Sequence, residues 1–352
     1  MLNKRELIKQ ILNPLMTWSR LDDPRPGFSI LLGVPWALRH LLAVNLRFVS
    51  RQNLDDLVGV HLVFDRIKQP GGDAFVESIR QRFPELPLDF QFHPPIAGRI
   101  TEKVNQSKFY AAMNWTRALA ACQSRYAILH DFDLYPIDPR YFARMYETLK
   151  DNQWLFAGYE TARFDGLTPE DLIFGSWNLA LDAQWVRSRY RPIDGYHKVA
   201  MVNGRRVDLD PFSYLQTLSP KRGLVPSLGP DAFAHVKNLC STFLRFNGGQ
   251  KVDLAWRLHY LWYLESLSEH PERLEEATRA MQEARSSRLT VAGQTVDFQG
   301  THVTCSNVLE KDLLMLEQNL YGGMRPEVST YIDEFRVFLT RMDEAASQAA
   351  AS

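Results

Sequence analysis

Two aspartates one residue apart, Asp131 and Asp133, follow an apolar run in the stretch "RYAILHDFDLYP". Carboxylate oxygens suit Mg²⁺ and Mn²⁺, and Mg²⁺ typically takes one or two protein carboxylates together with the phosphates of its ligand. An ion held in this way neutralises charge that develops on a departing diphosphate. The spacing therefore indicates a divalent-metal site that could hold a nucleoside diphosphate.

The elements before this pair predict how it is positioned. Apolar runs predict strands, and apolar residues at helical spacing predict the helices between them. The helix expected over 71–83 has Asp73 as its N-cap. This alternation predicts βαβ units, and therefore an α/β fold with a mostly parallel sheet and helices on both faces. Ligands of such sheets bind outside the carboxyl ends of the strands, where Asp65 and the Asp131/Asp133 pair are expected. The expected strands cover 28–34, 57–65, 88–92 and 126–129, and the expected helices cover 36–53, 71–83 and 104–122.

The rest of the chain is less regular. A short amphipathic helix is expected within 1–20, and short strands are expected at 154–160 and 176–182. After residue 250 the pattern is mainly helical, over 254–267, 271–285 and 307–343, with a hairpin at 288–298. We therefore expect an N-terminal helical extension (1–26), a sheet domain (27–246) and a mainly helical C-terminal region (247–352).

Composition excludes several classes of protein. Lys plus Arg equals Asp plus Glu, at 41 each among 352 residues, so net charge gives no reason to expect a nucleic acid partner. No run of eighteen apolar residues occurs, so no membrane span is expected. The three cysteines are isolated and the N-terminus carries charges within its apolar stretch, which favours free thiols, no signal peptide and a cytoplasmic protein.

Three segments resemble the nucleotide-sugar glycosyltransferases of the GT-A fold, most closely family 2 and its relatives. "FSILLGVPWALRH" resembles the family's first strand and its Pro-containing turn, here at Pro35. "LVGVHLVFD" resembles the second strand, whose terminal acid contacts the nucleotide base in the family, here Asp65. "AAMNWTRALAACQSRYAILHDFDLYP" resembles the helix and strand that carry the family's Asn and Asp-x-Asp motif, here Asn114, Asp131 and Asp133. The likeness covers about residues 28–235.

The resemblance also implies catalytic and binding residues further along the chain. The family's acceptor half carries an acid that acts as a general base, and "VDLDPFSYL" occupies its place, which favours Asp210 and then Asp208. His235 in "GPDAFAHVKN" matches the His that completes the metal site in many GT-A enzymes. Lys237 or Arg245 could contact the diphosphate. His130 adjoins Asp131 but is expected to point away from it on the strand.

Other acids and aromatic residues remain open candidates. The other possible bases are Asp165, Asp182 and Asp194. Four aromatic residues could stack on sugar rings or belong to the core: Trp154, Tyr159, Trp177 and Tyr196.

The sequence thus predicts a metal-dependent glycosyltransferase, inverting by its resemblance to family 2. It would use Mn²⁺ or Mg²⁺ and a UDP- or GDP-linked sugar, with a glycan, lipid-linked or protein acceptor. Asp133 and His235 would bind the ion, and Asp131 would act through water or on the ribose. The C-terminal helices would shape the acceptor side or form a contact between subunits of a homo-oligomer.

Two alternatives stay open. The first is a non-catalytic nucleotide- or carbohydrate-binding protein of the same fold. The second is a nucleotidyltransferase, which needs a Gly-rich basic loop after its first strand, whereas "GVPWALRH" has one glycine and no lysine.

Overall fold

The computed structural model describes residues 4–104 and 107–351. Residues 1–3 of the expected first helix and residues 105–106 of the helix expected over 104–122 lie outside this range. The chain forms two compact units. The first comprises Met1–Arg39, Val49–Phe132 and Asp138–Pro230, and the second comprises His40–Phe48, Asp133–Ile137 and Asp231–Ser352. The division at residues 26 and 246 stays a prediction.

The first unit is built on a seven-stranded sheet in the order β10-β6-β7-β4-β1-β2-β3. Neighbouring strands are parallel except at β7, which is antiparallel to both β4 and β6. The predicted mostly parallel α/β sheet is therefore confirmed. The strands are β1 (Arg25–Val34), β2 (Leu57–Phe64), β3 (Leu88–Phe92), β4 (Ser124–His130), β6 (Phe156–Gly158), β7 (Asn178–Asp182) and β10 (Arg222–Leu224).

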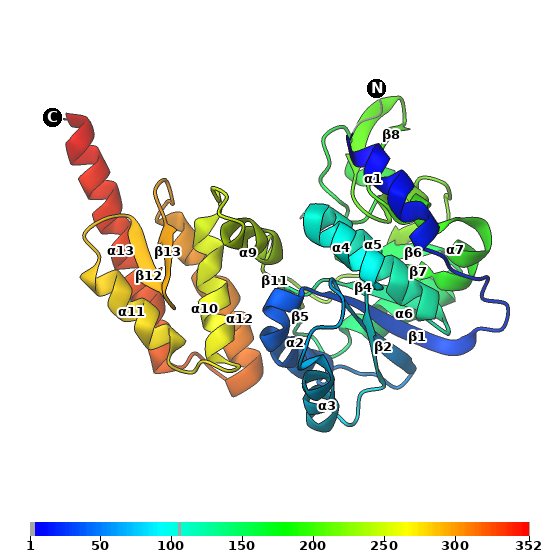
Figure 1. Ribbon diagram of the computed structural model, residues 1–352, viewed down its shortest axis with the longest axis horizontal. Helices are drawn as coiled ribbons and strands as arrows, with labels where there is room; N and C mark the ends of the chain where they lie inside the picture. The colour runs from blue at the N-terminus through cyan, green and yellow to red at the C-terminus, as the bar shows by residue number, and fades with distance from the viewer. Residues whose placement is uncertain (1–3, 105–106, 352) are drawn as a thin grey trace. The chain divides into compact units, whose positions relative to one another are not determined.

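Helices cover both faces of this sheet. Successive residues of a strand point to opposite faces, and consecutive residues of β1 and β4 are buried, so both faces are packed. On one face, Leu31 and Leu129 belong to a buried cluster with Leu119 of α5 (Ser107–Ala121), which runs along the sheet in Figure 1. On the other face, the ring of Phe28 contacts Tyr146 of α6 (Tyr141–Asp151). The remaining elements of this unit are α1 (Lys4–Leu12), η1 (Asn13–Leu15), α3 (Gly72–Arg82), α4 (Pro95–Val104), η3 (Pro169–Asp171), α7 (Ala183–Arg189), η4 (Pro192–Gly195), the hairpin of β8 (Lys198–Val202) and β9 (Arg205–Leu209), and α8 (Ser213–Gln216).

Two details of the helices differ from the sequence prediction. The N-cap of α3 is Gly71, which has a φ of 77°, and Asp73 lies in the first turn, where it forms an ion pair with Lys68. Helix α4, which follows directly after Pro94, was not predicted. A proline is tolerated in the first turn of a helix, where its missing N–H has no partner to lose, and α4 begins at Pro95.

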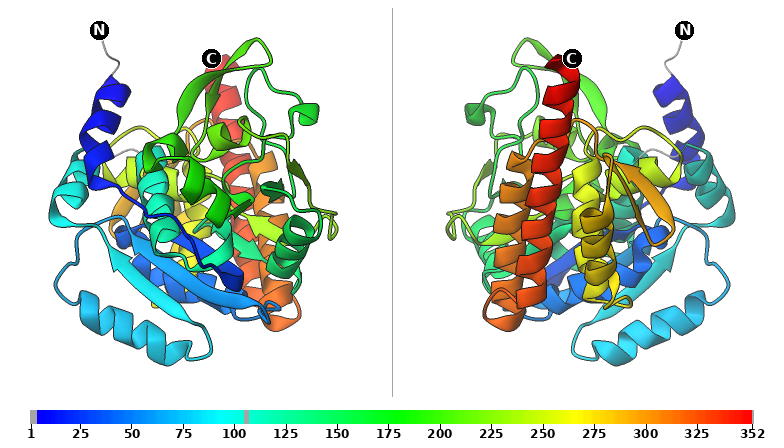
Figure 2. Two further views of the ribbon diagram at one scale, coloured as in Figure 1. Left: turned by 90° about the vertical axis from the view of Figure 1, so that its right-hand side faces the viewer. Right: turned by 90° about the vertical axis from the view of Figure 1, so that its left-hand side faces the viewer.

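The second unit is mainly helical, as expected for the C-terminal region. The single helix expected over 307–343 is two helices, because Gly322 takes up the left-handed conformation that ends the first. Figure 2 shows these two helices side by side in its right-hand view. The elements are α2 (Leu42–Val49), which follows η2 (Trp36–Leu41), then β5 (Leu134–Pro136), β11 (Phe233–His235), α9 (Leu239–Asn247), η5 (Ala255–Arg257), α10 (Leu258–Ser266), α11 (Arg273–Glu283), β12 (Arg288–Val291), β13 (Gln294–Asp297), α12 (Thr304–Tyr321) and α13 (Pro326–Ala351).

Within residues 4–104 and 107–351, no helix combines the length and the apolar character needed to cross a bilayer.

Candidate metal and nucleotide site

Three adjacent strands of the sheet end at the same edge. Val34 of β1 pairs with Phe64 of β2, and Leu32 of β1 pairs with His130 of β4. Pro35, Asp65 and Asp131 therefore follow the carboxyl ends of these strands, where the sequence predicted a ligand site. Because parallel strands lie about 4.8 Å apart, the outer two strand ends are separated by roughly 10 Å, a span suited to a nucleotide.

Asp133 is held beside His235 by backbone pairing within the second unit. Strands β5 and β11 are antiparallel, and His235 pairs with Leu134. The N–H of Val236 donates to the carbonyl of Asp133 at 2.9 Å, and Nε2 of His235 lies 3.6 Å from Oδ1 of Asp133. The N–H of Cys240, in the first turn of α9, donates to Oδ2 of Asp133 at 3.4 Å, so the positive end of a helix also faces this carboxylate.

The three predicted metal ligands come together. Asp131, Asp133 and His235 each offer one ligand atom, and these atoms lie within 4.8 Å of one another. Ligands on opposite sides of an octahedral Mg²⁺ stand about 4.2 Å apart, so the spacing of these atoms is close to what one ion requires. Carboxylate oxygens suit Mg²⁺ and Mn²⁺, and an imidazole nitrogen is an acceptable further ligand for Mn²⁺. The donor set therefore fits a divalent ion.

His130 lies on the other side of the strand, as the sequence predicted. Its ring packs edge-on against Phe142 of α6 at a centroid distance of 5.3 Å, and the residue is 1% exposed. It is a core residue, so His235 is the better candidate for an imidazole ligand.

Asp65 is a buried acid at the end of β2. Its Oδ1 accepts a hydrogen bond of 2.8 Å from the N–H of Trp36, the residue after Pro35. Burial raises the pKa of Asp65 to about 6, and the hydrogen bond from Trp36 offsets only part of this effect. A carboxylate buried at such a cost, at the edge where ligands bind, is a candidate for contact with a nucleotide.

Asn114 of α5 approaches the backbone at the end of β1. A Cβ on Gly33 would lie 3.1 Å from Cβ and from Nδ2 of Asn114, so the glycine permits this close approach. Oδ1 of Asn114 lies 2.7 Å from Nε2 of His93, the residue directly after β3. Burial lowers the pKa of His93 to about 4, so at neutral pH this ring is uncharged.

The two candidate bases have different surroundings. Oδ1 of Asp210 lies 2.8 Å from Nζ of Lys108, and Asp210 precedes α8 by three residues. Asp208 is exposed on β9, where it pairs with Val199 and lines a surface cavity together with Arg206. Neither placement tests catalysis, and the assignment of Asp210 ahead of Asp208 stays a prediction.

The other predicted contacts are less well supported by the structure. Lys237 lies two residues beyond His235, and its N–H donates to the His235 carbonyl at 2.8 Å. Arg245 is engaged elsewhere, because it donates to the Lys251 carbonyl at 2.9 Å and lies 3.8 Å from Asp253.

The aromatic residues proposed for sugar stacking divide into two groups. Tyr196 is 1% exposed and its hydroxyl faces Met16, so it belongs to the core. Trp154 lies directly against the backbone of Gly223, where a Cβ would come within 2.1 Å of its ring. Tyr159 is half-buried and stacks on Tyr141 at 4.9 Å, and Trp177 is half-buried beside Gly175. Trp154, Tyr159 and Trp177, which are all half-buried, remain open candidates.

Sequence reasoning missed three features of this site. The first is Trp36, whose N–H donates to Asp65. The second is His93, which contacts Asn114. The third is the first turn of α9, which faces Asp133. His93 could have been found, because it directly follows an expected strand at the same edge. The other two depend on backbone N–H groups, which leave no signal in side-chain type.

Comparison with known proteins gave matches only among solved structures. No family model matches the sequence, and no curated protein matches it. Mannosyltransferase PcManGT from Pyrobaculum calidifontis, in complex with GDP-Man and Mn²⁺, is 14% identical with a TM-score of 0.37, over 94% of this chain and 92% of that chain. TarS from S. aureus, in complex with UDP-GlcNAc, is 11% identical with a TM-score of 0.38, over 92% of each chain.

A third match is partial. Mannosyltransferase Ktr4p from S. cerevisiae, in complex with GDP, is 12% identical with a TM-score of 0.28, over 49% of this chain and 53% of that chain. The structures found include the class of enzyme that the sequence resembles.

Proposed function

We propose that the protein is a metal-dependent glycosyltransferase that moves a sugar from a nucleoside diphosphate to a hydroxyl group of a glycan, lipid-linked or protein acceptor. The observation that carries this proposal is the group formed by Asp131, Asp133 and His235, directly beyond the carboxyl end of β4. A metal-ligand set at that edge of a mostly parallel sheet is placed where a nucleotide's phosphates would lie.

Asp133 and His235 would hold the ion, and Asp131 would reach it through water or bind the ribose. When bound, Mn²⁺ or Mg²⁺ supplies Lewis-acid stabilisation of the diphosphate as it leaves. The helix terminus at Cys240 and the pairing of β5 with β11 keep Asp133 in place before the donor arrives. Preorganisation of this kind avoids a reorganisation cost during the reaction.

Asp65 and Asn114 would position the nucleotide, with the turn at Pro35 between them and Lys237 available to the diphosphate. The charged form of Asp65 is destabilised by burial, which raises its pKa. A donor N–H group on a nucleotide base would bind this carboxylate and offset part of that cost.

Asp210 would act as the general base, with Asp208 as the second candidate. Its carboxylate would accept the acceptor hydroxyl's proton while the oxygen forms a bond to the anomeric carbon and the bond to the diphosphate breaks. Displacement in one step inverts the configuration at that carbon. Lys108 now holds one carboxylate oxygen, and the other can accept the proton.

The test is a panel of UDP- and GDP-sugars, assayed for binding by thermal shift and for slow hydrolysis with and without Mn²⁺. We expect one donor to stabilise the fold by mass action and to be hydrolysed only with the metal. Asp133→Ala should abolish both effects, and Asp151→Ala, an exposed aspartate on α6, should preserve both.

Two results would support the alternatives instead. Donor binding without hydrolysis or transfer to any acceptor indicates a binding protein. Formation of a nucleotide sugar from a nucleoside triphosphate and a sugar phosphate indicates a nucleotidyltransferase. If no nucleotide sugar binds, the proposal fails.

A further inference from the structure

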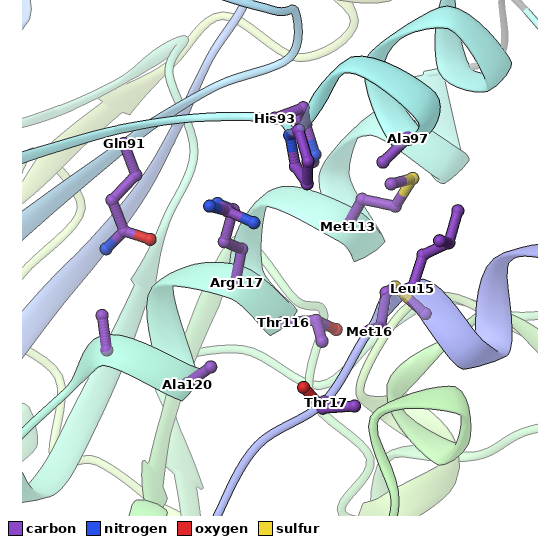
Figure 3. Close-up of a pocket in the computed structure, with 12 residues that line it drawn as sticks. Leu15, Met16, Thr17, Gln91, His93, Ala97, Met113, Thr116, Arg117 and Ala120 are labelled. Atoms are coloured by element: carbon purple, nitrogen blue, oxygen red, sulfur yellow. The ribbon is translucent and has the colours of Figure 1, made fainter.

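A separate cavity of about 250 Å³ lies in the first unit, beside the outer side of α5 (Figure 3). Its wall combines the chain around η1, the end of β3 and one side of α5. The volume corresponds to roughly eight water molecules, which is below the range of drug-sized ligand pockets. The cavity therefore suits a small ligand.

Arg117 is a half-buried cation in this cavity. Its guanidinium lies between Gln91 and His93 in Figure 3. Among the residues that the structure describes, its Nε is buried without a hydrogen-bond partner, and no carboxylate pairs with the side chain. Burial lowers the pKa of Arg117, and no acid counteracts this effect. A desolvated cation without a counter-ion is costly, and an anionic ligand would remove that cost.

Other polar residues line the cavity, among them Thr116, Gln91 and His93. Thr116 is 2% exposed, and its Oγ1 has no hydrogen-bond partner within the described part of the chain. Gln91 directs its amide to Oδ2 of Asp89 at 2.7 Å, and His93 directs Nε2 to Asn114. Among the described residues that line the cavity, Arg117 is thus the single charged group at neutral pH.

Apart from Thr17, the remaining wall is apolar. It contains Leu15, Met16, Ala97, Met113 and Ala120. Met16 is fixed by contact with the hydroxyl of Tyr196, so this side of the cavity is already built. A ligand that fits must carry a charged end and an apolar body.

We propose that this cavity binds a small monocarboxylate with a short apolar tail, held by Arg117 through its planar fork and by the apolar wall through the tail. Arg and carboxylate groups match in shape and form paired hydrogen bonds. A carboxylate carries one negative charge, which one guanidinium neutralises, whereas a phosphate dianion would keep an uncompensated charge. His93 supplies no second positive charge at neutral pH.

This inference goes beyond the proposed glycosyl transfer and does not depend on it. The two sites are connected, however, because His93 lines the cavity and contacts Asn114 at 2.7 Å. A bound carboxylate could thereby bias the position of Asn114 next to β1.

The test is isothermal titration calorimetry of the whole protein with hexanoate, with no nucleotide sugar present. We expect saturable one-to-one binding that is at least tenfold weaker in Arg117→Gln. The matched control is Arg99→Gln, which removes an exposed arginine from the neighbouring helix α4 and should leave hexanoate affinity unchanged. Hexanol, which has the same tail without the charge, should bind at least tenfold more weakly than hexanoate.

A second variant tests the cavity itself. Ala120→Leu fills the apolar wall while keeping Arg117, and it should also weaken hexanoate at least tenfold, with folding checked by thermal unfolding. Equal hexanoate affinity in the wild type, Arg117→Gln and Ala120→Leu would overturn the site. Binding of inorganic phosphate without binding of hexanoate would overturn the carboxylate assignment, and so would absence of any saturable binding.

Discussion

Replacing Asp65 by Asn tests whether the protein retains a buried charge at the expense of stability. The pKa of this carboxyl rises from 3.8 to about 6 on folding, because the residue is 3% exposed. A rise of roughly two units is worth about 3 kcal/mol at 1.36 kcal/mol per unit. The folded state binds the proton more tightly than the unfolded chain, so the associated stability is fully present below pH 3.8 and is lost as the pH rises through 6.

The measurement is the free energy of unfolding by urea, from pH 4 to pH 8, for the wild type and Asp65→Asn. The difference between the two proteins should shift by about 2.5 kcal/mol across this range, in favour of Asp65→Asn at the higher pH, because part of the effect is already lost at pH 4. Other titrating groups are common to both proteins and cancel. An unpaired amide N–H in the variant would add a constant offset and leave the pH dependence unchanged.

Asp89 provides a control of opposite sign. The hydrogen bond with His61 lowers the pKa of Asp89, so its stabilising effect is present at neutral pH and is lost as the pH falls through the folded-state pKa. Asp89→Asn should therefore lose stability at neutral pH relative to acid. A stability difference between the wild type and Asp65→Asn that stays flat from pH 4 to pH 8 would refute the reasoning. If the nucleotide site is correct, Asp65→Asn should also bind the donor more weakly despite its gain in stability.

Three further predictions concern the metal, the base and the packing of the sheet edge. His235→Gln should weaken Mn²⁺ binding at least ~10-fold by electron paramagnetic resonance, while His130→Gln should leave the affinity intact; equal losses would contradict the assignment of His235. Asp210→Asn should lower the turnover of sugar transfer by about 10²–10⁴-fold with little change in donor KM, and Asp208→Asn should act more weakly; full activity in Asp210→Asn would exclude it as the base. Gly223→Ala places a Cβ 2.1 Å from Trp154 and should cost about 1–3 kcal/mol of unfolding free energy in urea, whereas Gly323→Ala meets no atom within 4 Å and should change it by less than about 0.5 kcal/mol.

Elements that depend on the residue pattern of a short segment could be predicted from the sequence. The strands expected at 28–34 and 57–65 are β1 and β2 within a few residues, because buried parallel strands read as continuous apolar runs. The strand expected at 88–92 is β3, which is half-buried and alternates apolar and polar residues. Residues at the ends of those strands were predictable too, since parallel strands bring their carboxyl ends to one edge. Asp65 and Asp131 were placed by that argument alone.

The parts that depend on distant pairing were not predictable. The antiparallel direction of β7 leaves no mark in its five residues, and the three-residue strands β5 and β11 are too short to show a period. His235 was recognised by its resemblance to a family and by its spacing, whereas the pairing that carries it to Asp133 is a tertiary property. Hydrogen bonds from backbone N–H groups, such as those of Trp36 and Cys240, also follow from tertiary placement.

The pairing of β5 with β11 also sets an order of events during synthesis. His235 is translated 102 positions after Asp133, and ribosomes add about 5–20 residues per second, so roughly 5–20 s separate the two residues. Throughout that interval Leu134 and Tyr135, which are fully buried in the finished protein, have no strand to pair with. An unpaired apolar edge is a hazard for aggregation. A nascent chain that stalls before residue 233 would therefore present this edge and both aspartates to the cell, without the histidine that accompanies them.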